Sequence, residues 1–272
     1  LARQRGASWI VADGYHFGAD YQRIIKEAGL CLLFIDDDGQ AEHYYADIVL
    51  NQNLHARESF YAGKEPYTRL LLGIRYVLLR REFLQRREWK REIAEVARKV
   101  LVTLGGGDPD NVTLKVVQAL QRVKGDGLEA MVVIGGSNPH YEELQSAIKD
   151  SHSSVRLQRN VTNMPELMAW ADLAISSGGT TVWELAFMGL PALVGVIAPI
   201  EELLLDGLKE QRLFVNVGWF SQLSVEQLAE ALIAAMEDGK MRSHTSLLGR
   251  KLVDGYGADR VLEAMNEKFA EK

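Results

Sequence analysis

The feature that most constrains the fold is the alternation of short apolar runs with amphipathic segments along almost the whole chain. The apolar runs at 8–13, 30–35 and 46–51 are too short for buried helices and are typical of strands. Between them, residues 19–29 have helical spacing and end in a glycine. Because strands that alternate with helices form parallel sheets, this pattern predicts an α/β fold.

A second series of the same kind begins near residue 100. Its expected elements are strands at 100–104, 128–134, 153–161, 172–177 and 190–197, and helices at 112–123, 141–150, 162–171, 180–189, 224–238 and 258–272. Between the two series, residues 85–99 mix both signs of charge, which indicates a solvated helix or a linker rather than a binding patch. We therefore expect an N-terminal domain at 1–96, a second domain at 97–250 and a C-terminal helix at 251–272.

The composition allows one large or two ordinary domains and disfavours some partners. The 272 residues are 47% hydrophobic and 25% charged, and a net charge of −6 disfavours binding to a nucleic-acid backbone. No apolar run reaches the length of a membrane span, and the single cysteine allows no disulfide framework, so we expect a cytoplasmic protein. The opening "LARQRG" is typical of the tail of a helix, which predicts that the beginning of the protein is missing.

Three strand ends of the second series run into glycines, which are Gly105 to Gly107, Gly135 to Gly136, and Gly178 to Gly179. Parallel sheets bind ligands beyond the carboxyl ends of their strands. Glycine lets the backbone approach an anion, and a following helix offers free N–H groups. The loops at 105–107 and 178–179 lead directly into helices, so together they predict a diphosphate site. Tight strand-to-helix turns are the structural alternative.

Glu184 is one acid inside the otherwise apolar helical segment "TTVWELAFMG". A carboxylate in that position favours a ligand-binding role. However, Thr181 to Glu184 also match a capping box, in which the glutamate returns to the backbone at the start of its own helix. The residues alone leave both interpretations open.

Common nucleotide and metal motifs fit the chain badly. It has no GxxxxGK[ST] sequence, and "GGGDPD" lacks the third glycine of a dinucleotide fingerprint. Asp36, Asp37 and Asp38 contain a D-x-D pattern that could hold Mn²⁺ or Mg²⁺ against a diphosphate. A turn at the end of a strand is the favoured interpretation of this triple acid. The histidines show no metal-ligand spacing, so we expect neither a metal nor another cofactor.

Several stretches together resemble one family. "ISSGGTTVWELAFMGLPALV" is similar to the sugar-nucleotide signature of the GT-B fold, and "WIVADGYHFGADYQRIIKEAGLCLLFIDDDGQAEHYYADIVLNQNLHA", "LLGIRYVLLRREF" and "VTLGGGDPDN" also fit. The chain most resembles the UDP-2,4-diacetamido-2,4,6-trideoxy-β-L-altropyranose hydrolases of pseudaminic acid biosynthesis. The peptidoglycan UDP-GlcNAc transferase is a more distant relative. The resemblance implies two Rossmann-like domains facing a cleft, with the first domain truncated and the second carrying UDP.

The resemblance also implies roles for particular residues. Glu184 would accept hydrogen bonds from both ribose hydroxyls, a task suited to the two oxygens of a carboxylate. The remaining implied nucleotide contacts are Gly106, Gly107, Gly178, Gly179, Thr180 and Thr181 at the diphosphate, and Asn160, Val161 and Met164 at the uracil.

The catalytic candidates are Asp13, Tyr15 and His16, at the end of a strand of the first domain. Tyr15 matches the family's active-site tyrosine in "DHYG", whereas Gly14 stands at the family's histidine position. A histidine beside a cleft can transfer protons near neutral pH, and a turn residue without a role is the alternative for His16. Asn51 and Asn53 end another strand toward the same cleft, with loop capping as their alternative.

The implied reaction is attack of water on a UDP-sugar, which releases UDP and a free sugar. The family's catalytic histidine lies in a GxGH motif that this sequence does not contain. The residues at 198–202 also replace the Asn-Gln of many relatives, which leaves the sugar open. A GT-B glycosyltransferase with a UDP-sugar donor and a truncated, non-catalytic UDP-sugar binding module are therefore the alternatives.

Overall fold

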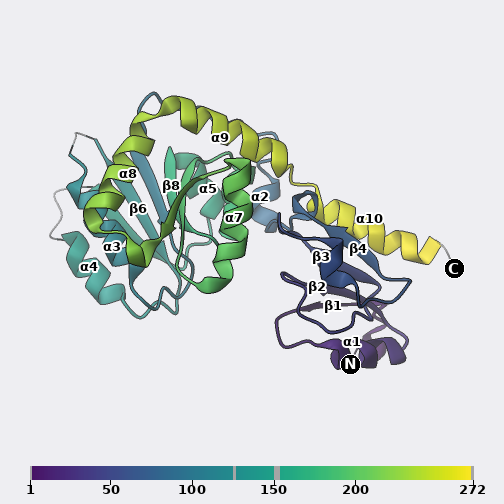
Figure 1. The fold of residues 1–272 in the computed structure, drawn as a ribbon. Helices are drawn as coiled ribbons and strands as arrows, with labels where there is room; N and C mark the ends of the chain where they lie inside the picture. The colour runs from purple at the N-terminus through teal and green to yellow at the C-terminus, as the bar shows by residue number, and fades with distance from the viewer. Residues whose placement is uncertain (1, 125–126, 150–153, 271–272) are drawn as a thin grey trace. The chain divides into compact units, whose positions relative to one another are not determined.

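The chain forms two compact units, each built around its own parallel sheet (Figure 1). The computed structural model describes residues 2–124, 127–149 and 154–270. The first unit combines Leu1–Leu78 with Gly255–Lys272, and the second is Leu79–Asp254. Within the described residues, no helix is both long enough and apolar enough to span a membrane.

The first unit has a four-stranded parallel sheet in which the strands are ordered along the chain. Its elements are η1 (Arg3–Arg5), β1 (Trp9–Asp13), α1 (Ala19–Glu27), β2 (Cys31–Ile35), β3 (Ile48–Asn51), η2 (Glu58–Tyr61), β4 (Arg69–Leu72), η3 (Ile74–Tyr76) and α10 (Gly257–Ala270). Both faces of β2 are covered. Leu32 and Phe34 pack in one apolar cluster, and Leu33 packs with Val261 and Ala264 of α10 in another. This explains why β2 is a continuous apolar run rather than an alternating one.

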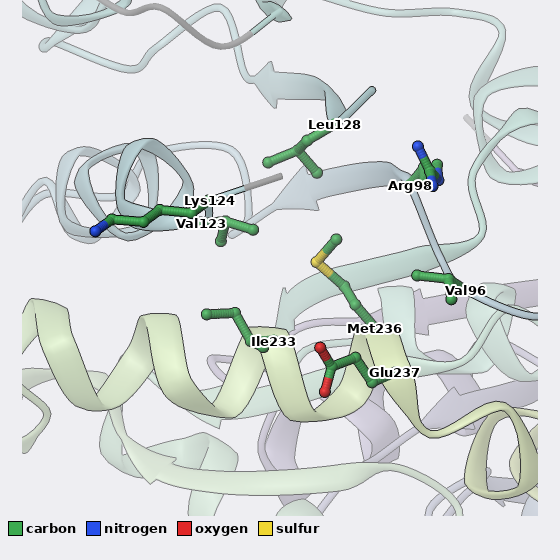
Figure 2. Close-up of a pocket in the computed structure, with 8 residues that line it drawn as sticks. All are labelled: Val96, Arg98, Val123, Lys124, Leu128, Ile233, Met236 and Glu237. Atoms are coloured by element: carbon green, nitrogen blue, oxygen red, sulfur yellow. The ribbon is translucent and has the colours of Figure 1, made fainter. Parts of the chain in front are cut away.

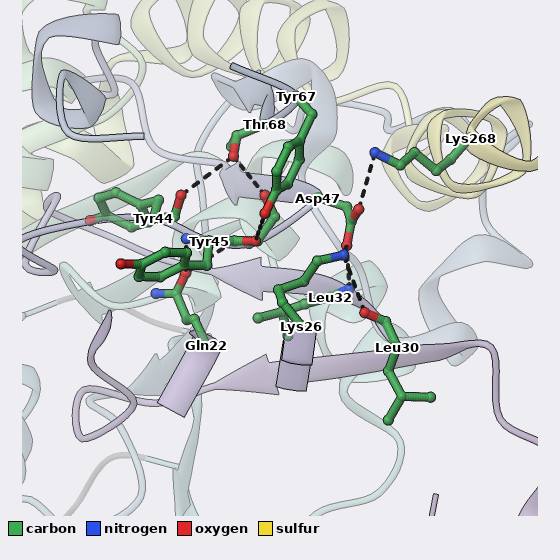
Figure 3. Close-up of polar contacts among 11 residues, drawn as sticks. Gln22, Lys26, Leu30, Leu32, Tyr44, Tyr45, Asp47, Tyr67, Thr68 and Lys268 are labelled. Carbon is green, nitrogen blue, oxygen red and sulfur yellow. Dashed lines mark hydrogen bonds and ion pairs between the residues drawn. The ribbon is translucent and has the colours of Figure 1, made fainter. Parts of the chain in front are cut away.

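A buried carboxylate fastens α10 to this sheet (Figure 3). Asp47 lies just before β3 and is only 2% exposed. Lys26 and Lys268 both pair with it, and the backbone N–H of Leu32 donates to it at 2.8 Å. Burial raises the pKa of Asp47, but these three donors outweigh burial and hold the pKa below its usual range. The Tyr67 ring lies 5.5 Å and 5.0 Å from the two ammonium groups, which adds cation–π stabilisation.

The second unit has a six-stranded parallel sheet in the order β10-β9-β8-β5-β6-β7. Its strands are β5 (Lys99–Thr103), β6 (Glu129–Ile134), β7 (Ser154–Arg159), β8 (Leu173–Ser177), β9 (Ala192–Val196) and β10 (Val215–Trp219). Its helices are α2 (Arg81–Leu84), α3 (Val112–Arg122), α4 (Tyr141–Lys149), α5 (Met164–Trp170), α6 (Thr181–Phe187), η4 (Pro199–Glu201), α7 (Glu202–Gln211), η5 (Phe220–Gln222), α8 (Val225–Glu237) and α9 (Gly239–Leu252). The strand order reverses between β5 and β8, and such a reversal is where open α/β sheets bind ligands.

Contacts group residues 79–96 with the second unit, although the sequence suggested a boundary after 96. The residues between α2 and β5 form no helix, so they are the linker that the charge pattern allowed. Two arginines attach this linker to the second unit. Arg91 donates to the carbonyl of Met188 at 3.2 Å, and Arg242 donates to the carbonyl of Ala94 at 3.0 Å. The limits 97–250 stay a prediction for the extent of the nucleotide-binding domain.

Candidate functional site

The candidate site is a cavity of about 280 Å³ at the carboxyl ends of β5, β6 and β7, in the second unit. Its lining residues come from five separate segments and are Arg80, Thr103, Gly105, Gly106, Val133, Ile134, Gly135, Asn160, Val161, Met164, Thr181 and Glu184. The cavity therefore lies beside the strand reversal, where the topology places a ligand. It brings together six of the residues predicted from the sequence, which are Gly106, Asn160, Val161, Met164, Thr181 and Glu184.

Another cavity of the second unit contains none of the predicted residues (Figure 2). It measures about 150 Å³ and is lined mainly by apolar side chains that include Val123, Leu128 and Met236. Val96 and Leu128 precede β5 and β6, so this cavity lies at the amino ends of those strands. It is on the wrong edge of a parallel sheet for the expected ligand.

The glycine loops serve two different purposes. A Cβ on Gly135 would lie 2.3 Å from the carbonyl oxygen of Gly106, and a Cβ on Gly136 would lie 2.6 Å from the Asn160 side chain. Glycine is thus required at Gly135 by the neighbouring backbone, whereas at Gly136 only the end of a side chain is close. A Cβ on Gly106 or Gly107 would meet nothing within 4 Å, so that backbone is open. An open backbone is the kind that an anion can approach.

The segment that follows β9 packs against the loop after β8. A Cβ on Gly178 would lie 2.9 Å from Leu205 and 3.1 Å from Glu201. Packing therefore accounts for Gly178 without a ligand. Four predicted contacts, Gly107, Gly178, Gly179 and Thr180, do not line the cavity, whereas Thr181 at the start of α6 does.

Glu184 forms a bidentate ion pair with Arg80. Nε of Arg80 donates to one carboxylate oxygen at 2.7 Å, and a terminal nitrogen donates to the other at 3.0 Å. The Glu184 side chain is 13% exposed and that of Arg80 is 46% exposed. Burial raises the pKa of Glu184, and Arg80 only partly offsets this effect. The capping-box interpretation of Glu184 is wrong, because α6 has Thr180 at its N-cap and no side-chain capping bond.

Arg80 is a site residue that sequence reasoning missed. It lies 104 positions from Glu184 and precedes α2 in a charged stretch, so no local pattern links the two residues. One of its terminal nitrogens also lies 3.1 Å from Glu82, and its guanidinium lies 5.1 Å from the Phe83 ring.

The residues predicted to contact the uracil lie after β7. Asn160 has a φ of 56°, in the left-handed region, and its N–H donates to the carbonyl of Ile134 at 3.1 Å. Val161 follows, and Met164 is the first residue of α5. Asn163 is at the N-cap of this helix, and its side chain makes no capping bond. The chain here turns sharply and brings Asn160 and Met164 to the same cavity.

In the first unit, Asp37 joins several polar residues at the carboxyl ends of the strands. It accepts a hydrogen bond from the Tyr15 hydroxyl at 2.9 Å and from the Asn53 amide at 2.8 Å. Its carbonyl accepts from Asn51 at 2.8 Å. Burial, followed by the bond and charge of Asp37, raises the pKa of Tyr15 to about 12. Tyr15 is therefore a protonated phenol at neutral pH.

The other two catalytic candidates are less closely connected. Asp13 ends β1 and is exposed, and its charge contributes to the raised pKa of Tyr15. The His16 ring packs on that of Phe17, with 4.1 Å between the ring centroids. The charge of Asp13 therefore acts on the Tyr15 phenol. The catalytic roles of Asp13, Tyr15 and His16 stay predictions.

The triple acid forms the turn expected at the end of a strand. Asp36 is 2% exposed and accepts hydrogen bonds from the N–H of Gly39 at 3.0 Å and from the Tyr44 hydroxyl at 2.8 Å. Asp37 is occupied by Tyr15 and Asn53. Among the residues that the structure describes, no group of three or more His, Cys, Asp or Glu side chains is arranged to hold a metal ion.

Comparison with known proteins identifies the family. The family model described as "Glycosyltransferase family 28 C-terminal domain" matches residues 100–247. The chain belongs to this family. The match covers β5 to α9, and thus every strand of the second unit and most of the cavity.

Curated relatives cover more of the chain. A UDP-2,4-diacetamido-2,4,6-trideoxy-beta-L-altropyranose hydrolase of Campylobacter jejuni is 29% identical over 186 residues, 68% of this chain and 64% of that protein. The spore coat polysaccharide biosynthesis protein SpsG of Bacillus subtilis is 27% identical over 242 residues, 89% of this chain and 70% of that protein. An uncharacterized Methanocaldococcus jannaschii protein is 30% identical over 191 residues, but the chain spans only 39% of its length. These matches confirm the resemblance at the level of the family.

Solved structures with the same fold are much more distant in sequence. MurG of Acinetobacter baumannii is 16% identical with a TM-score of 0.66, over 98% of this chain and 76% of that one. An S. aureus MnaA–UDP co-structure is 12% identical with a TM-score of 0.68, over 99% of this chain and 78% of that one. At such identities the likeness concerns the fold alone, and it confirms the predicted GT-B class.

Proposed function

We propose that this chain binds a UDP-sugar and that its protein hydrolyses the sugar–diphosphate bond, releasing UDP and a free amino or deoxy sugar. The observation that carries the proposal is the cavity beside the strand reversal. It joins one buried carboxylate, the open backbone at Gly105 and Gly106, and a sharply turned segment after β7. The hydrolase name of the C. jejuni relative supports the reaction class.

Each part of the cavity suits one part of UDP. The two oxygens of Glu184 suit the vicinal hydroxyls of a ribose. The backbone at Gly105 and Gly106 and the start of α6 at Thr181 suit a diphosphate, because free N–H groups bind anions. The segment Asn160 to Met164 suits the flat uracil ring, which backbone groups can read without a charged side chain.

The proposed reaction needs stabilisation of the leaving group above all. Water attacks the anomeric carbon, the bond from carbon to the diphosphate oxygen breaks, and the negative charge on that oxygen grows while the attacking water releases one proton to solvent. The N–H groups around Gly106 and Thr181 would stabilise this charge, which is a large source of rate enhancement in general. In the first unit, Tyr15 would act as a phenolic hydrogen-bond donor or acceptor, since its raised pKa keeps it protonated.

Calorimetric titration tests the nucleotide site. The chain should bind UDP but not ADP, and Glu184→Ala should weaken UDP binding by at least about tenfold, since a hydrogen bond to a charged group contributes roughly 1.5–3 kcal/mol. Glu230→Ala is the matched control, because Glu230 is an exposed glutamate in the middle of α8. A folded chain that binds no UDP, or an equal loss in both variants, would refute the proposal.

A second candidate function is glycosyl transfer from the same UDP-sugar to an acceptor, which the family description favours. The two reactions differ in the nucleophile and not in the nucleotide site. UDP release from UDP-N-acetylated sugars without any acceptor supports hydrolysis. Release that depends on an added acceptor supports transfer.

A further inference from the structure

Arg80 is shared between two carboxylates. Two of its nitrogens donate to both oxygens of Glu184, at 2.7 Å and 3.0 Å. Its remaining terminal nitrogen lies 3.1 Å from Glu82. All three residues belong to the second unit, and both Arg80 and Glu184 line the candidate cavity.

The ion pair competes with a ribose for Glu184. Arg80 is the more exposed partner, at 46% against 13%. A vicinal diol would donate to the same two oxygens, one hydrogen bond from each hydroxyl. Each carboxylate oxygen accepts at about two sites and Arg80 already fills one on each, so a bound ribose would either share the carboxylate with Arg80 or displace it.

Glu82 provides a place for the displaced guanidinium. Its side chain is 40% exposed and it already contacts Arg80, so an exchange requires only a small rotation of the arginine. The Phe83 ring, 5.1 Å from the guanidinium carbon, can stay in contact during this movement. Arg80 would keep a carboxylate partner in both positions, which lowers the cost of moving it.

We propose that Arg80 covers Glu184 in the ligand-free chain and that ribose binding transfers it to Glu82. This carboxylate exchange rests on the proposed function, because it assumes that Glu184 binds a ribose. In this exchange Arg80 competes with the ribose for Glu184. Glu82 favours ribose binding because it receives Arg80, although Glu82 itself does not line the cavity.

Uridine is the suitable probe, because it carries the ribose and the base without phosphate. Arg80→Met removes the competitor, so uridine affinity should rise about three- to tenfold, the range expected from an ion pair of roughly 1 kcal/mol. Arg80→Lys, which keeps the charge without the bidentate geometry, should give an intermediate affinity. Glu82→Gln should weaken uridine binding a few-fold in the native chain and have no effect in the Arg80→Met background. Titrations at about pH 8 keep the carboxylates ionised.

The results separate this inference from the proposed function. Unchanged or weaker uridine binding by folded Arg80→Met, or an equal effect of Glu82→Gln in both backgrounds, would overturn the exchange. If UDP binding is nevertheless lost in Glu184→Ala, the proposed function survives that failure. If neither uridine nor UDP binds to any folded variant, both fall. Circular dichroism establishes that each variant is folded, and Arg80→Lys retains a counter-ion for Glu184 if Arg80→Met does not fold.

Discussion

The buried Asp47 should make α10 an essential part of the first unit. Lys268 is the residue of α10 that reaches Asp47, at 3.0 Å, and its side chain is 26% exposed. A hydrogen bond between charged groups contributes about 1.5–3 kcal/mol. Lys26 and the N–H of Leu32 stay on the carboxylate when Lys268 is removed. We therefore expect Lys268→Met to lower the free energy of unfolding by about 1–2 kcal/mol, around and slightly below the lower end of that range.

Replacing the carboxylate itself should cost more. Asp47→Ala would leave two ammonium groups without their counter-ion, a change that typically costs about 3–5 kcal/mol at a buried pair. The pKa of Asp47 is lowered in the folded chain, so its stabilisation is present above the ordinary carboxyl pKa and is lost as the pH falls through the folded value. The difference between native chain and Asp47→Ala should accordingly shrink in acid.

Hydrogen exchange combined with denaturant unfolding measures this effect locally. In Lys268→Met, the amides of α10 should exchange about tenfold faster, since 1.4 kcal/mol corresponds to a factor of ten. Lys251→Met on α9 is the matched control, because Lys251 is exposed. Unchanged exchange in α10, or the same acceleration in both variants, would refute the view that this ion pair fastens the helix.

Three other predictions concern the sites. Ultraviolet titration should show Tyr15 ionising near pH 12, and Asp37→Asn should lower that midpoint because it removes the negative charge beside the phenol; an unchanged midpoint would contradict the contact. The pKa of Glu184 is raised, so its contribution to stability falls as the pH rises from the ordinary carboxyl pKa through the folded value, and Glu184→Gln should remove this part of the pH dependence in thermal unfolding. Gly135→Ala should cost about 1–3 kcal/mol, because its Cβ would lie 2.3 Å from a backbone oxygen, whereas Gly107→Ala should cost much less in the same denaturant assay.

Most strands and helices could be predicted because their apolar spacing is local. The strand at Arg69–Leu72 and the helix at Glu202–Gln211 were not predicted, and neither were the helix at Gly239–Leu252 and the strand at Val215–Trp219. The helix buries Arg242 and Thr245, which sequence reasoning places on a surface, and the strand contains a register irregularity at Gly218. In both elements the tertiary contacts override the local pattern.

The candidate site could be predicted in part for a similar reason. Glycines mark loops, but the sequence does not distinguish Gly178, which packing requires, from Gly106, which is open. Only the positions of neighbouring side chains separate the two cases. Arg80 was missed because its partner is distant in sequence, so a contact of this kind becomes visible only when the fold brings the segments together.

The pair of Glu184 and Arg80 is difficult to explain by stability alone. Burial of the Glu184 carboxylate costs desolvation that its attraction to the half-exposed Arg80 only partly repays, and apolar residues of similar volume often serve the fold equally well. The raised pKa of Glu184 reports this cost directly, because burial outweighs the arginine. A fold that needed only to fill this part of the cavity wall would be as stable with an apolar side chain at position 184. A carboxylate paired with an arginine at this position is instead what the proposed site for a ligand with paired hydroxyls would use.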